Sequence, residues 1–217
     1  MVRMTTMRRF FDGHAPHWDG YQRPSDFEQV GRIIDRVAPG PADSVLDVGC
    51  GTGILVPFLE AKGVQWYLGM DLSPGMAVQF RRKHPRRDLV VGDFAEENLR
   101  PGSFTLVIVF NAFPHFDDEE RVFARSFQVL RPGGRLVVAH SMNRDQLDEH
   151  HRKAGRAVED HVLIADAEFA RLYKQAGFVD VTVENTDHFY SCGRRPPVAA
   201  SAARRSTRSG LRPRQAE

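Results

Sequence analysis

The feature that most constrains the fold is a glycine-rich turn at residues 46–53, with the sequence Leu-Asp-Val-Gly-Cys-Gly-Thr-Gly. A short apolar strand at 44–48 precedes the glycines, and residues 54–61 have the composition of a helix. Three glycines remove side chains where the backbone turns tightly, so a ligand can lie against the main chain. The spacing differs from the Gly-x-Gly-x-x-Gly pattern of dinucleotide-binding turns, because the third glycine is missing in either register. Asp47 would also repel a pyrophosphate, so the turn suits a ligand with a positive group.

The segments after this turn alternate between strand and helix patterns. Short apolar runs predict six further strands, at residues 65–70, 89–91, 104–110, 136–140, 179–183 and 188–192. Ser73, Asp166 and the acidic run 117–120 mark helix N-termini, and Pro132-Gly133-Gly134 is expected to end a helix. This alternation predicts an α/β fold with helices on both faces of a parallel sheet. Ligands of such sheets bind beyond the carboxyl ends of the strands, so we expect the functional residues in the loops there.

Composition divides the chain into three parts. Residues 1–43 predict a helical lid, and residues 44–193 form the α/β domain. The lid contains an amphipathic run with apolar residues at helical spacing: Phe27, Val30, Ile33, Ile34 and Val37. Residues 194–217 hold seven arginines and one glutamate without apolar periodicity, so we expect a disordered basic tail. The rest of the chain is then net negative, which argues against nucleic acid as the main partner, because gripping it requires a basic face on the fold.

Several protein classes are excluded by composition. Two cysteines, Cys50 and Cys192, exclude a disulfide framework and a four-cysteine zinc site, and Cys50 is expected to be a small packing residue. The apolar run from Leu106 to Phe110 is far shorter than the roughly 20 residues of a membrane helix. The N-terminus lacks the apolar core of a secretory signal. We therefore expect a cytoplasmic protein without a membrane span.

Five motifs in order resemble class I S-adenosylmethionine-dependent methyltransferases. They are residues 46–53, Met70-Asp71-Leu72-Ser73, Gly92-Asp93-Phe94, residues 111–116 and residues 130–134. The motifs are most similar to the small-molecule branch that includes the ubiquinone and menaquinone biosynthesis methyltransferases, as is the opening Phe-Asp-x-x-Ala-x-x-Trp-Asp at residues 11–19. The resemblance implies a Rossmann-like, seven-stranded, mostly parallel sheet beneath an N-terminal lid. It also implies S-adenosyl-L-methionine as the cofactor and a small molecule as the methyl acceptor.

The resemblance assigns the first cofactor contacts to the glycine-rich turn and the strand after it. Asp47, Gly49, Gly51 and Gly53 match the segment that holds the methionine part of the cofactor. Asp71, at the end of the second strand, would accept hydrogen bonds from both ribose hydroxyls, because a carboxylate offers two acceptors in one rigid group.

Further contacts are expected after the third and fourth strands. Asp93 would accept a hydrogen bond from the adenine amino group, with Leu72 and Phe94 beside the purine. Asn111 would line the reactive end of the cofactor. Structural alternatives exist for two of these residues, since Asp93 also suits a turn and Asn111 also suits the capping of a strand end.

Histidines are the candidates for catalysis. His115 follows the fourth strand and His140 ends the fifth, so both are predicted to face the substrate, where either would serve as a general base. The opposing interpretation is that alignment of the reactants suffices and that each histidine is solvated or caps a turn.

The segment 147–161 adds further histidines. On one straight helix, His150 and His161 would lie about 16 Å apart, too far to share an ion. The open alternatives are a metal site on a bent chain, a lining of the substrate pocket that also uses His14 or His17, and an exposed polar helix. No metal ligand is assigned.

Two other functions compete with a small-molecule methyltransferase. One is a ligand- or metal-sensing protein without catalysis on the same fold. The other is an RNA or protein methyltransferase guided by the basic tail. The run from Asn111 to His115 differs from the Asn/Asp-Pro-Pro-aromatic run of enzymes that methylate nucleobase amino groups, which disfavours that substrate class. The sequence indicates no oligomeric state.

Overall fold

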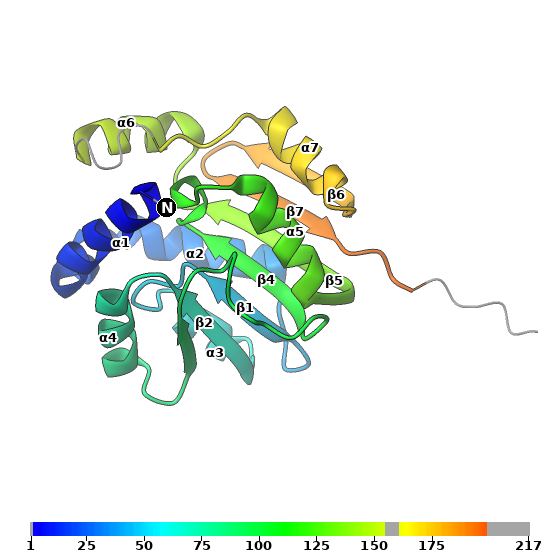
Figure 1. Ribbon diagram of the computed structural model, residues 1–217, viewed down its shortest axis with the longest axis horizontal. Helices are drawn as coiled ribbons and strands as arrows, with labels where there is room; N and C mark the ends of the chain where they lie inside the picture. Colours follow the sequence, from blue (N-terminus) through cyan, green and yellow to red (C-terminus); the bar gives the residue numbers. More distant parts are fainter. Residues whose placement is uncertain (1, 155–160, 199–217) are drawn as a thin grey trace, which may run out of the picture.

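The computed structural model describes residues 2–154 and 161–198 and contains one seven-stranded sheet (Figure 1). The strands are β1 (Ser44–Val48), β2 (Trp66–Asp71), β3 (Asp88–Val91), β4 (Phe104–Phe110), β5 (Leu130–His140), β6 (Val179–Asn185) and β7 (Phe189–Arg194). Their order is β3-β2-β1-β4-β5-β7-β6, with β1 to β5 paired in parallel and β7 antiparallel to β5 and β6. The predicted Rossmann-like sheet and its closing hairpin are confirmed.

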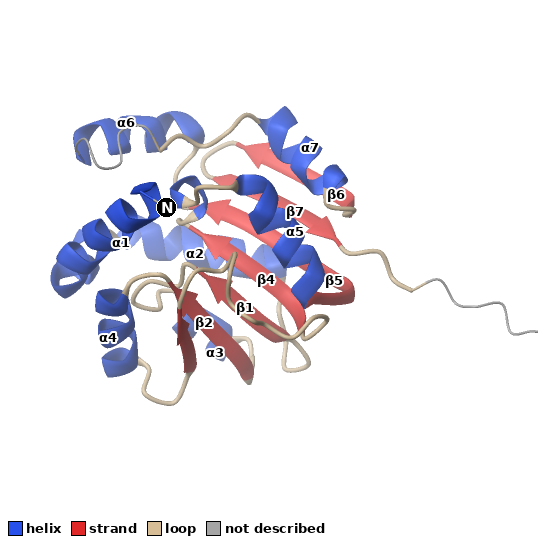
Figure 2. Cartoon of the chain, in the orientation of Figure 1, coloured by secondary structure: helices blue, strands red, loops and turns tan. Residues whose placement is uncertain are grey.

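Helices cover both faces of the sheet (Figure 2). They are α1 (Val2–His14), η1 (Ala15–Tyr21), α2 (Pro24–Val37), α3 (Val56–Ala61), α4 (Pro74–Lys83), η2 (Phe113–His115), α5 (Glu119–Val129), α6 (Arg144–Ala154) and α7 (Asp166–Gln175). Successive side chains of a strand point to opposite faces. In β4, Leu106 and Ile108 therefore pack in the core that includes α2 and α3, whereas Val107 and Val109 pack in the core that includes α5 and α7. Among the described residues, no helix has the length and apolar character needed to cross a membrane.

The helix α2 follows its predicted amphipathic pattern with one exception. Its first turn holds Pro24, whose missing N–H has no helical partner to lose, and Asp26, which accepts a hydrogen bond from the Arg23 backbone N–H (2.8 Å). Its buried residues include Val30, Ile33, Ile34 and Val37. Phe27 is 43% exposed, contrary to the prediction, because it lies in the first turn, ahead of the stretch that packs on the sheet.

One predicted helix end is wrong. The helix α5 ends at Val129 and β5 begins at Leu130, so Pro132-Gly133-Gly134 lies within the strand. Leu130 already pairs with Phe104 of β4, which extends the chain before the proline is reached.

One predicted helix cap is also wrong. Ala165, not Asp166, is the N-cap of α7. Asp166 lies in the first turn, where its carboxylate accepts a hydrogen bond from the Arg144 guanidinium (2.5 Å).

The boundary expected at residue 194 falls inside the fold. Arg194 is the last residue of β7 and pairs with Arg135 of β5. The Arg195 backbone N–H donates to the Gly134 carbonyl (2.8 Å), and its guanidinium donates to the Phe127 carbonyl (2.8 Å). The part of the predicted tail at 199–217 lies outside the described residues.

Candidate functional site

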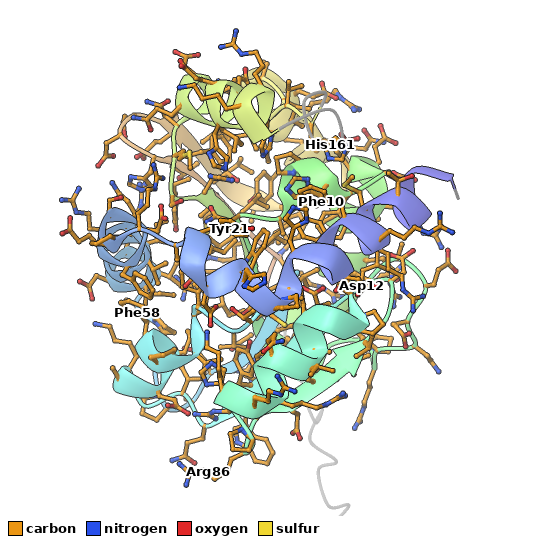
Figure 3. All side chains as sticks on the ribbon, turned by 90° about the vertical axis from the view of Figure 1, so that its left-hand side faces the viewer. Phe10, Asp12, Tyr21, Phe58, Arg86 and His161 are labelled. Atoms are coloured by element: carbon orange, nitrogen blue, oxygen red, sulfur yellow. The ribbon has the colours of Figure 1, made fainter. Side chains whose placement is uncertain are left out.

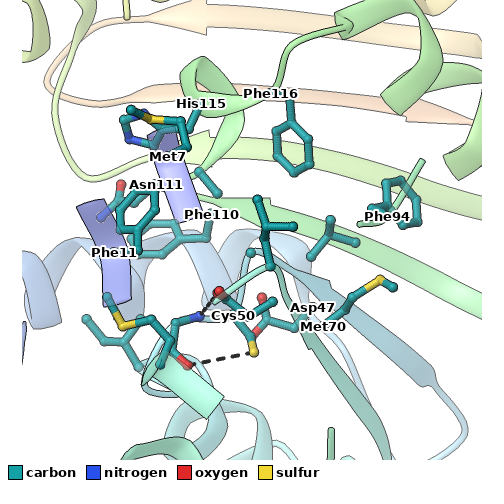
Figure 4. A pocket seen from close by; sticks show the side chains of 18 of the residues that line it. Met7, Phe11, Asp47, Cys50, Met70, Phe94, Phe110, Asn111, His115 and Phe116 are labelled. Atoms are coloured by element: carbon teal, nitrogen blue, oxygen red, sulfur yellow. Dashed lines mark hydrogen bonds between the residues drawn. The ribbon is translucent and has the colours of Figure 1, made fainter. Parts of the chain in front are cut away.

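A cavity of about 880 Å³ lies beyond the carboxyl ends of β1, β2, β4 and β5. The lid formed by α1 and η1 covers the cavity. Figure 3 shows the lid crossing the face of the molecule that is on the left in Figure 1. One end, the glycine-turn end, is lined by Asp47, Gly49, Gly51, Asp71 and Asp93; the other, the histidine end, is lined by His115, His140, His150 and His151. Figure 4 shows Asp47 and Cys50 on one side of the cavity and Phe11, Asn111 and His115 on the other. All of the predicted site residues except Gly53 therefore line one space.

Two of the three glycines in the turn are required for packing. Gly49 and Gly53 have positive φ angles of 73° and 90°, a region that glycine occupies without strain. A Cβ on Gly49 would lie 2.5 Å from the Cβ of Ala112, and a Cβ on Gly53 would lie 2.5 Å from the ring of His84. These two glycines let the turn approach its neighbours closely.

Gly51 also has a positive φ (55°), but it differs because its missing side chain leaves space in the cavity. A Cβ there would meet only the Trp18 indole nitrogen, at 3.8 Å. The Gly51 N–H donates to the Asp71 carboxylate (2.7 Å), which also accepts the Ser73 N–H (2.9 Å). Burial raises the pKa of Asp71, and these two N–H donors oppose the rise. Each carboxylate oxygen keeps a second lone pair for a ligand hydroxyl.

Asp47 is a buried carboxyl at the same end. It is 1% exposed and accepts a hydrogen bond from the Tyr67 hydroxyl (2.8 Å). Burial raises the pKa of Asp47 to about 7; the Tyr67 hydrogen bond opposes the rise and the nearby Asp71 charge adds to it. A positively charged ligand would relieve the repulsion between the two carboxylates. The two carboxylates, Asp47 and Asp71, therefore fit a cationic ligand that carries hydroxyl groups.

The third expected carboxylate, Asp93, forms a turn and also lines the cavity. Its Oδ1 atom accepts the Ala95 N–H (2.9 Å). Leu72 and Phe94 line the cavity beside it, and Phe94 is at the same time part of the buried core.

Asn111 caps the ends of two strands. It has a positive φ of 52°, its Oδ1 accepts the Ser141 N–H (2.8 Å), and its amide donates to the Ser141 hydroxyl (3.2 Å). Its side chain lines the cavity, so the capping role and a position beside a ligand coexist.

Two aspartates fasten the lid to the domain. Asp12 accepts hydrogen bonds from the Ser73 hydroxyl (2.6 Å) and from a backbone N–H in the first turn of α4 (2.8 Å). Asp19 accepts from the Thr52 hydroxyl (2.5 Å) and pairs with Lys83 (2.9 Å). These are the aspartates of the opening at residues 11–19, and they hold the lid over the glycine turn.

Aromatic rings of the lid face the cavity. The rings of Phe11 and Trp18 meet edge to face at 5.6 Å, and Phe11 also meets the ring of His115 at 5.2 Å. Tyr21 lines the rim of the cavity but is 60% exposed.

His140 is buried and electrically neutral. Burial lowers the pKa of His140 to about 3, and the neighbouring His151 and His150 lower it further. Its Nδ1 atom accepts the Met142 N–H (3.3 Å), so the ring hydrogen is on Nε2. A histidine in this state is a weak base and a hydrogen-bond donor.

The other histidines divide between the cavity and the surface. His14, His150 and His151 line the cavity, as the pocket-lining hypothesis predicted, whereas His17 is exposed. The described residues contain no group of three or more histidines, cysteines or carboxylates arranged to hold a metal ion.

The sequence does not predict His161 as a partner in the site. One helix over 147–161 would place it on the same face as His150, but residue 161 itself is not helical. Its Nδ1 atom lies 2.9 Å from Nδ1 of His115, and its carbonyl accepts a hydrogen bond from His151 Nδ1. No spacing in the sequence indicates this pairing, because 46 residues separate the two histidines.

Comparison with known proteins identifies the family. The family model described as a methyltransferase domain matches residues 46–138. An uncharacterized methyltransferase of Geobacillus kaustophilus is 32% identical over 167 residues, which cover 70% of this chain and 76% of that protein. The chain belongs to the class I S-adenosylmethionine-dependent methyltransferases.

A second relative of this chain carries a more specific name. The demethylmenaquinone methyltransferase of Renibacterium salmoninarum is 31% identical over 134 residues, which cover 59% of this chain and 56% of that protein. Matches to the first curated relatives span 48%, 56% and 44% of their lengths, so the chain spans about half of them.

The fold is shared with solved structures. A SAM-dependent methyltransferase of Thermotoga maritima, described as a possible histamine N-methyltransferase, has a TM-score of 0.72 at 16% identity. The alignment covers 87% of this chain and 99% of the Thermotoga chain. S-adenosylmethionine is the cofactor of the family, and the geometry of the glycine-turn end fits its charges and hydroxyls.

Proposed function

We propose that this methyltransferase transfers a methyl group from S-adenosylmethionine to a small-molecule acceptor. The observation that carries the proposal is the single cavity that joins the glycine-turn end to the histidine end beneath an aromatic lid. A cavity of this size holds a cofactor and a small acceptor side by side. The name of the Renibacterium relative supports a small acceptor.

The glycine-turn end is assigned to the methionine and ribose parts of the cofactor. Asp71 would accept the ribose hydroxyls through its remaining lone pairs while the Gly51 and Ser73 N–H groups hold it in place. Gly51 would leave room for the cofactor, and Gly49 and Gly53 would shape the turn. Asp47 would face the positive charge of the methionine part, and that charge would favour its ionised form.

The remaining cofactor contacts are assigned to the loops after β3 and β4. Asp93 would accept a hydrogen bond from the adenine amino group, and Leu72 and Phe94 would contact the purine. Asn111, fixed by Ser141, would lie at the reactive end.

The histidine end is assigned to the acceptor. The bound cofactor supplies a methyl group activated by a positively charged sulfur. The lid and the surrounding apolar side chains exclude water and align the acceptor, which contributes much of the rate. His140, neutral with its hydrogen on Nε2, would donate a hydrogen bond to the acceptor, and His115 would take its proton.

Calorimetry with S-adenosylhomocysteine tests the cofactor site. Wild type is expected to bind, and Gly51→Val to lose binding, because a branched side chain would fill the space beneath Trp18. Gly102→Val is the matched control: Gly102 also has a positive φ (66°), but a Cβ there meets nothing within 4 Å. Normal binding by Gly51→Val would show that the turn is only structural.

Turnover separates the enzyme from its rivals. Release of S-adenosylhomocysteine with a small acceptor excludes a sensor that only binds. Deletion of residues 199–217 is expected to leave that activity unchanged. Loss of activity in the deletion variant would favour an RNA or protein substrate recruited by the basic tail.

A further inference from the structure

Tyr67, which has no part in the proposed function, holds the buried carboxyl group of Asp47. Its hydroxyl donates a hydrogen bond to Oδ2 of Asp47 (2.8 Å), and the two residues are 6% and 1% exposed. Burial raises the pKa of the Tyr67 hydroxyl well above its ordinary value, and the charge of Asp47 raises it further. The hydroxyl therefore keeps its hydrogen and acts as a fixed donor to the carboxylate.

Gly69 leaves the space through which this hydroxyl reaches Asp47. Gly69 of β2 is paired with Asp47 of β1, and Tyr67 lies two residues earlier on the same face of the sheet. A Cβ on Gly69 would lie 3.2 Å from the Tyr67 hydroxyl and 3.0 Å from Sγ of Cys50. A glycine inside a strand often marks a close approach of this kind. The Tyr67 ring also stacks on Phe80, with the ring centres 6.1 Å apart.

The hydrogen bond occupies one oxygen of Asp47 and leaves the other for a ligand. Oδ2 accepts from Tyr67, whereas Oδ1 has no hydrogen-bond partner anywhere in residues 2–154 and 161–198. Asp47 lines the cavity. A primary ammonium group brings three N–H donors and a compact positive charge. The methionine part of the cofactor carries such a group, and Oδ1 is the acceptor left for it.

We propose that Tyr67 is a positioning residue that holds Asp47 as an ionised carboxylate against the ammonium group of the cofactor, and that cofactor binding releases a proton from Asp47 to water. This inference rests on the proposed function. It adds to that function the residue that prepares Asp47 and a dependence of cofactor affinity on pH.

The free protein offers Asp47 a hydrogen bond but no positive charge. Burial raises the pKa of Asp47 to about 7; the Tyr67 hydrogen bond opposes the rise, and the charge of Asp71 adds to it. About half of the molecules therefore carry a proton on Asp47 at pH 7. An ammonium group at Oδ1 favours the ionised form, so binding removes that proton.

The other titratable and charged groups that act on this pair are Cys50, Asp71 and Arg87. Burial raises the pKa of Cys50 well above its ordinary value, so the thiol stays neutral. Arg87 is held by Glu60 (2.9 Å). Burial also raises the pKa of Asp71, so its ribose contacts can release a proton of their own. An experiment on Asp47 must therefore compare samples that share the Asp71 contacts.

Calorimetry in two buffers of different ionisation enthalpy counts the protons released when S-adenosylhomocysteine binds at pH 7. Wild type is expected to release about half a proton more than Asp47→Asn. The same excess is expected, in wild type, over the desamino analogue of S-adenosylhomocysteine, which lacks the ammonium group but keeps the ribose. Both comparisons leave the Asp71 contacts unchanged. No excess in either comparison overturns the proton release.

The variant Tyr67→Phe tests the positioning role. At pH 7 we expect it to bind S-adenosylhomocysteine about 5- to 50-fold more weakly than wild type, because Asp47 loses its donor and is protonated in more of the molecules. The difference should shrink to a few-fold at pH 8.5, where Asp47 ionises without the hydroxyl. A purely structural role would weaken binding equally at both pH values, and that result overturns the proposal.

The matched control is Tyr173→Phe. Tyr173 is also buried, but its hydroxyl bonds to Ser191 (3.2 Å) and to the Leu136 carbonyl (3.3 Å) rather than to a carboxylate. This variant is expected to keep the wild-type affinity at both pH values. Circular dichroism checks that both variants are folded.

The substitution Tyr67→fluorotyrosine keeps the ring in place and tests the same role if Tyr67→Phe does not fold. Fluorine makes the hydroxyl a stronger donor, so the rise of affinity with pH should move to lower pH than in wild type. A rise that does not move to lower pH overturns the positioning role. Wild type that binds S-adenosylhomocysteine without the proton excess contradicts only this inference, whereas wild type that does not bind it contradicts the proposed function.

Discussion

The glycine-turn end and the histidine end of the cavity are built from different kinds of contact. At the glycine-turn end, Asp71 is fixed by backbone N–H groups of Gly51 and Ser73, all within the β1–β2 region. At the histidine end, the ring of His115 contacts the rings of Phe11, from α1, and His161. The first arrangement follows from local turns, whereas the second exists only when distant segments pack. Substitutions at the two ends should therefore have separable effects on cofactor affinity and on turnover.

The largest expected effect is on turnover at the histidine end. We predict that His115→Ala lowers kcat by about 10² to 10⁴, the range for loss of a general base. Affinity for S-adenosylhomocysteine, measured by calorimetry, should remain within about two-fold of wild type. A joint loss of affinity and turnover would contradict the separation of the two ends.

The next effect is on affinity at the glycine-turn end. We predict that Asp71→Ala weakens S-adenosylhomocysteine binding by roughly 10- to 150-fold, which corresponds to about 1.5–3 kcal/mol for hydrogen bonds to a charged group. Calorimetry measures the change, and circular dichroism checks that the variant is folded. Unchanged affinity would place the ribose elsewhere.

One buried group at each end should also change the stability of the fold with pH, and the two changes should have opposite signs. The pKa of His140 is lowered to about 3, so between that value and its unfolded pKa the unfolded state binds more protons. Its contribution to stability is present above the unfolded pKa and falls as the pH falls, by about 2 kcal/mol between pH 7.5 and pH 5. The pKa of Asp47 is raised to about 7, so its contribution falls as the pH rises from its unfolded pKa toward 7.

Urea unfolding at pH 5 and pH 7.5 checks this opposition. We compare with wild type the change in the free energy of unfolding on going from pH 5 to pH 7.5. This change should be more negative in His140→Phe than in wild type, and more positive in Asp47→Asn. Identical pH dependence in all three proteins would show that neither group is held in the state described.

The smallest expected effect concerns the lid that covers both ends. Asp12→Ala removes two hydrogen bonds, one from the Ser73 hydroxyl and one from a backbone N–H in the first turn of α4, which should cost about 1 kcal/mol. S-adenosylhomocysteine should then dissociate several-fold faster, as measured by stopped-flow fluorescence of Trp18. Asp35→Ala is the control, because Asp35 forms an exposed ion pair with Lys62 outside the cavity.

The sequence by itself determined the sheet, the glycine turn and the positions of Asp71, Asp93 and Asn111. Apolar periodicity and turn residues act over a few neighbours, and a parallel sheet brings the carboxyl ends of its strands to one edge. The same local rules misplaced the end of α5, because pairing of Leu130 with Phe104 extends the chain before its proline.

Only the tertiary structure decided the chemistry of the histidines. Burial makes His140 neutral, and packing brings His161 to His115. Nothing in the sequence around these histidines distinguishes them from exposed ones. Asp12 and Asp19 of the lid likewise accept hydrogen bonds from Ser73 and Thr52, which lie about 60 and 30 residues away in the sequence. Proton affinity and contacts between distant side chains depend on the three-dimensional surroundings of a group, which spacing along the chain does not encode.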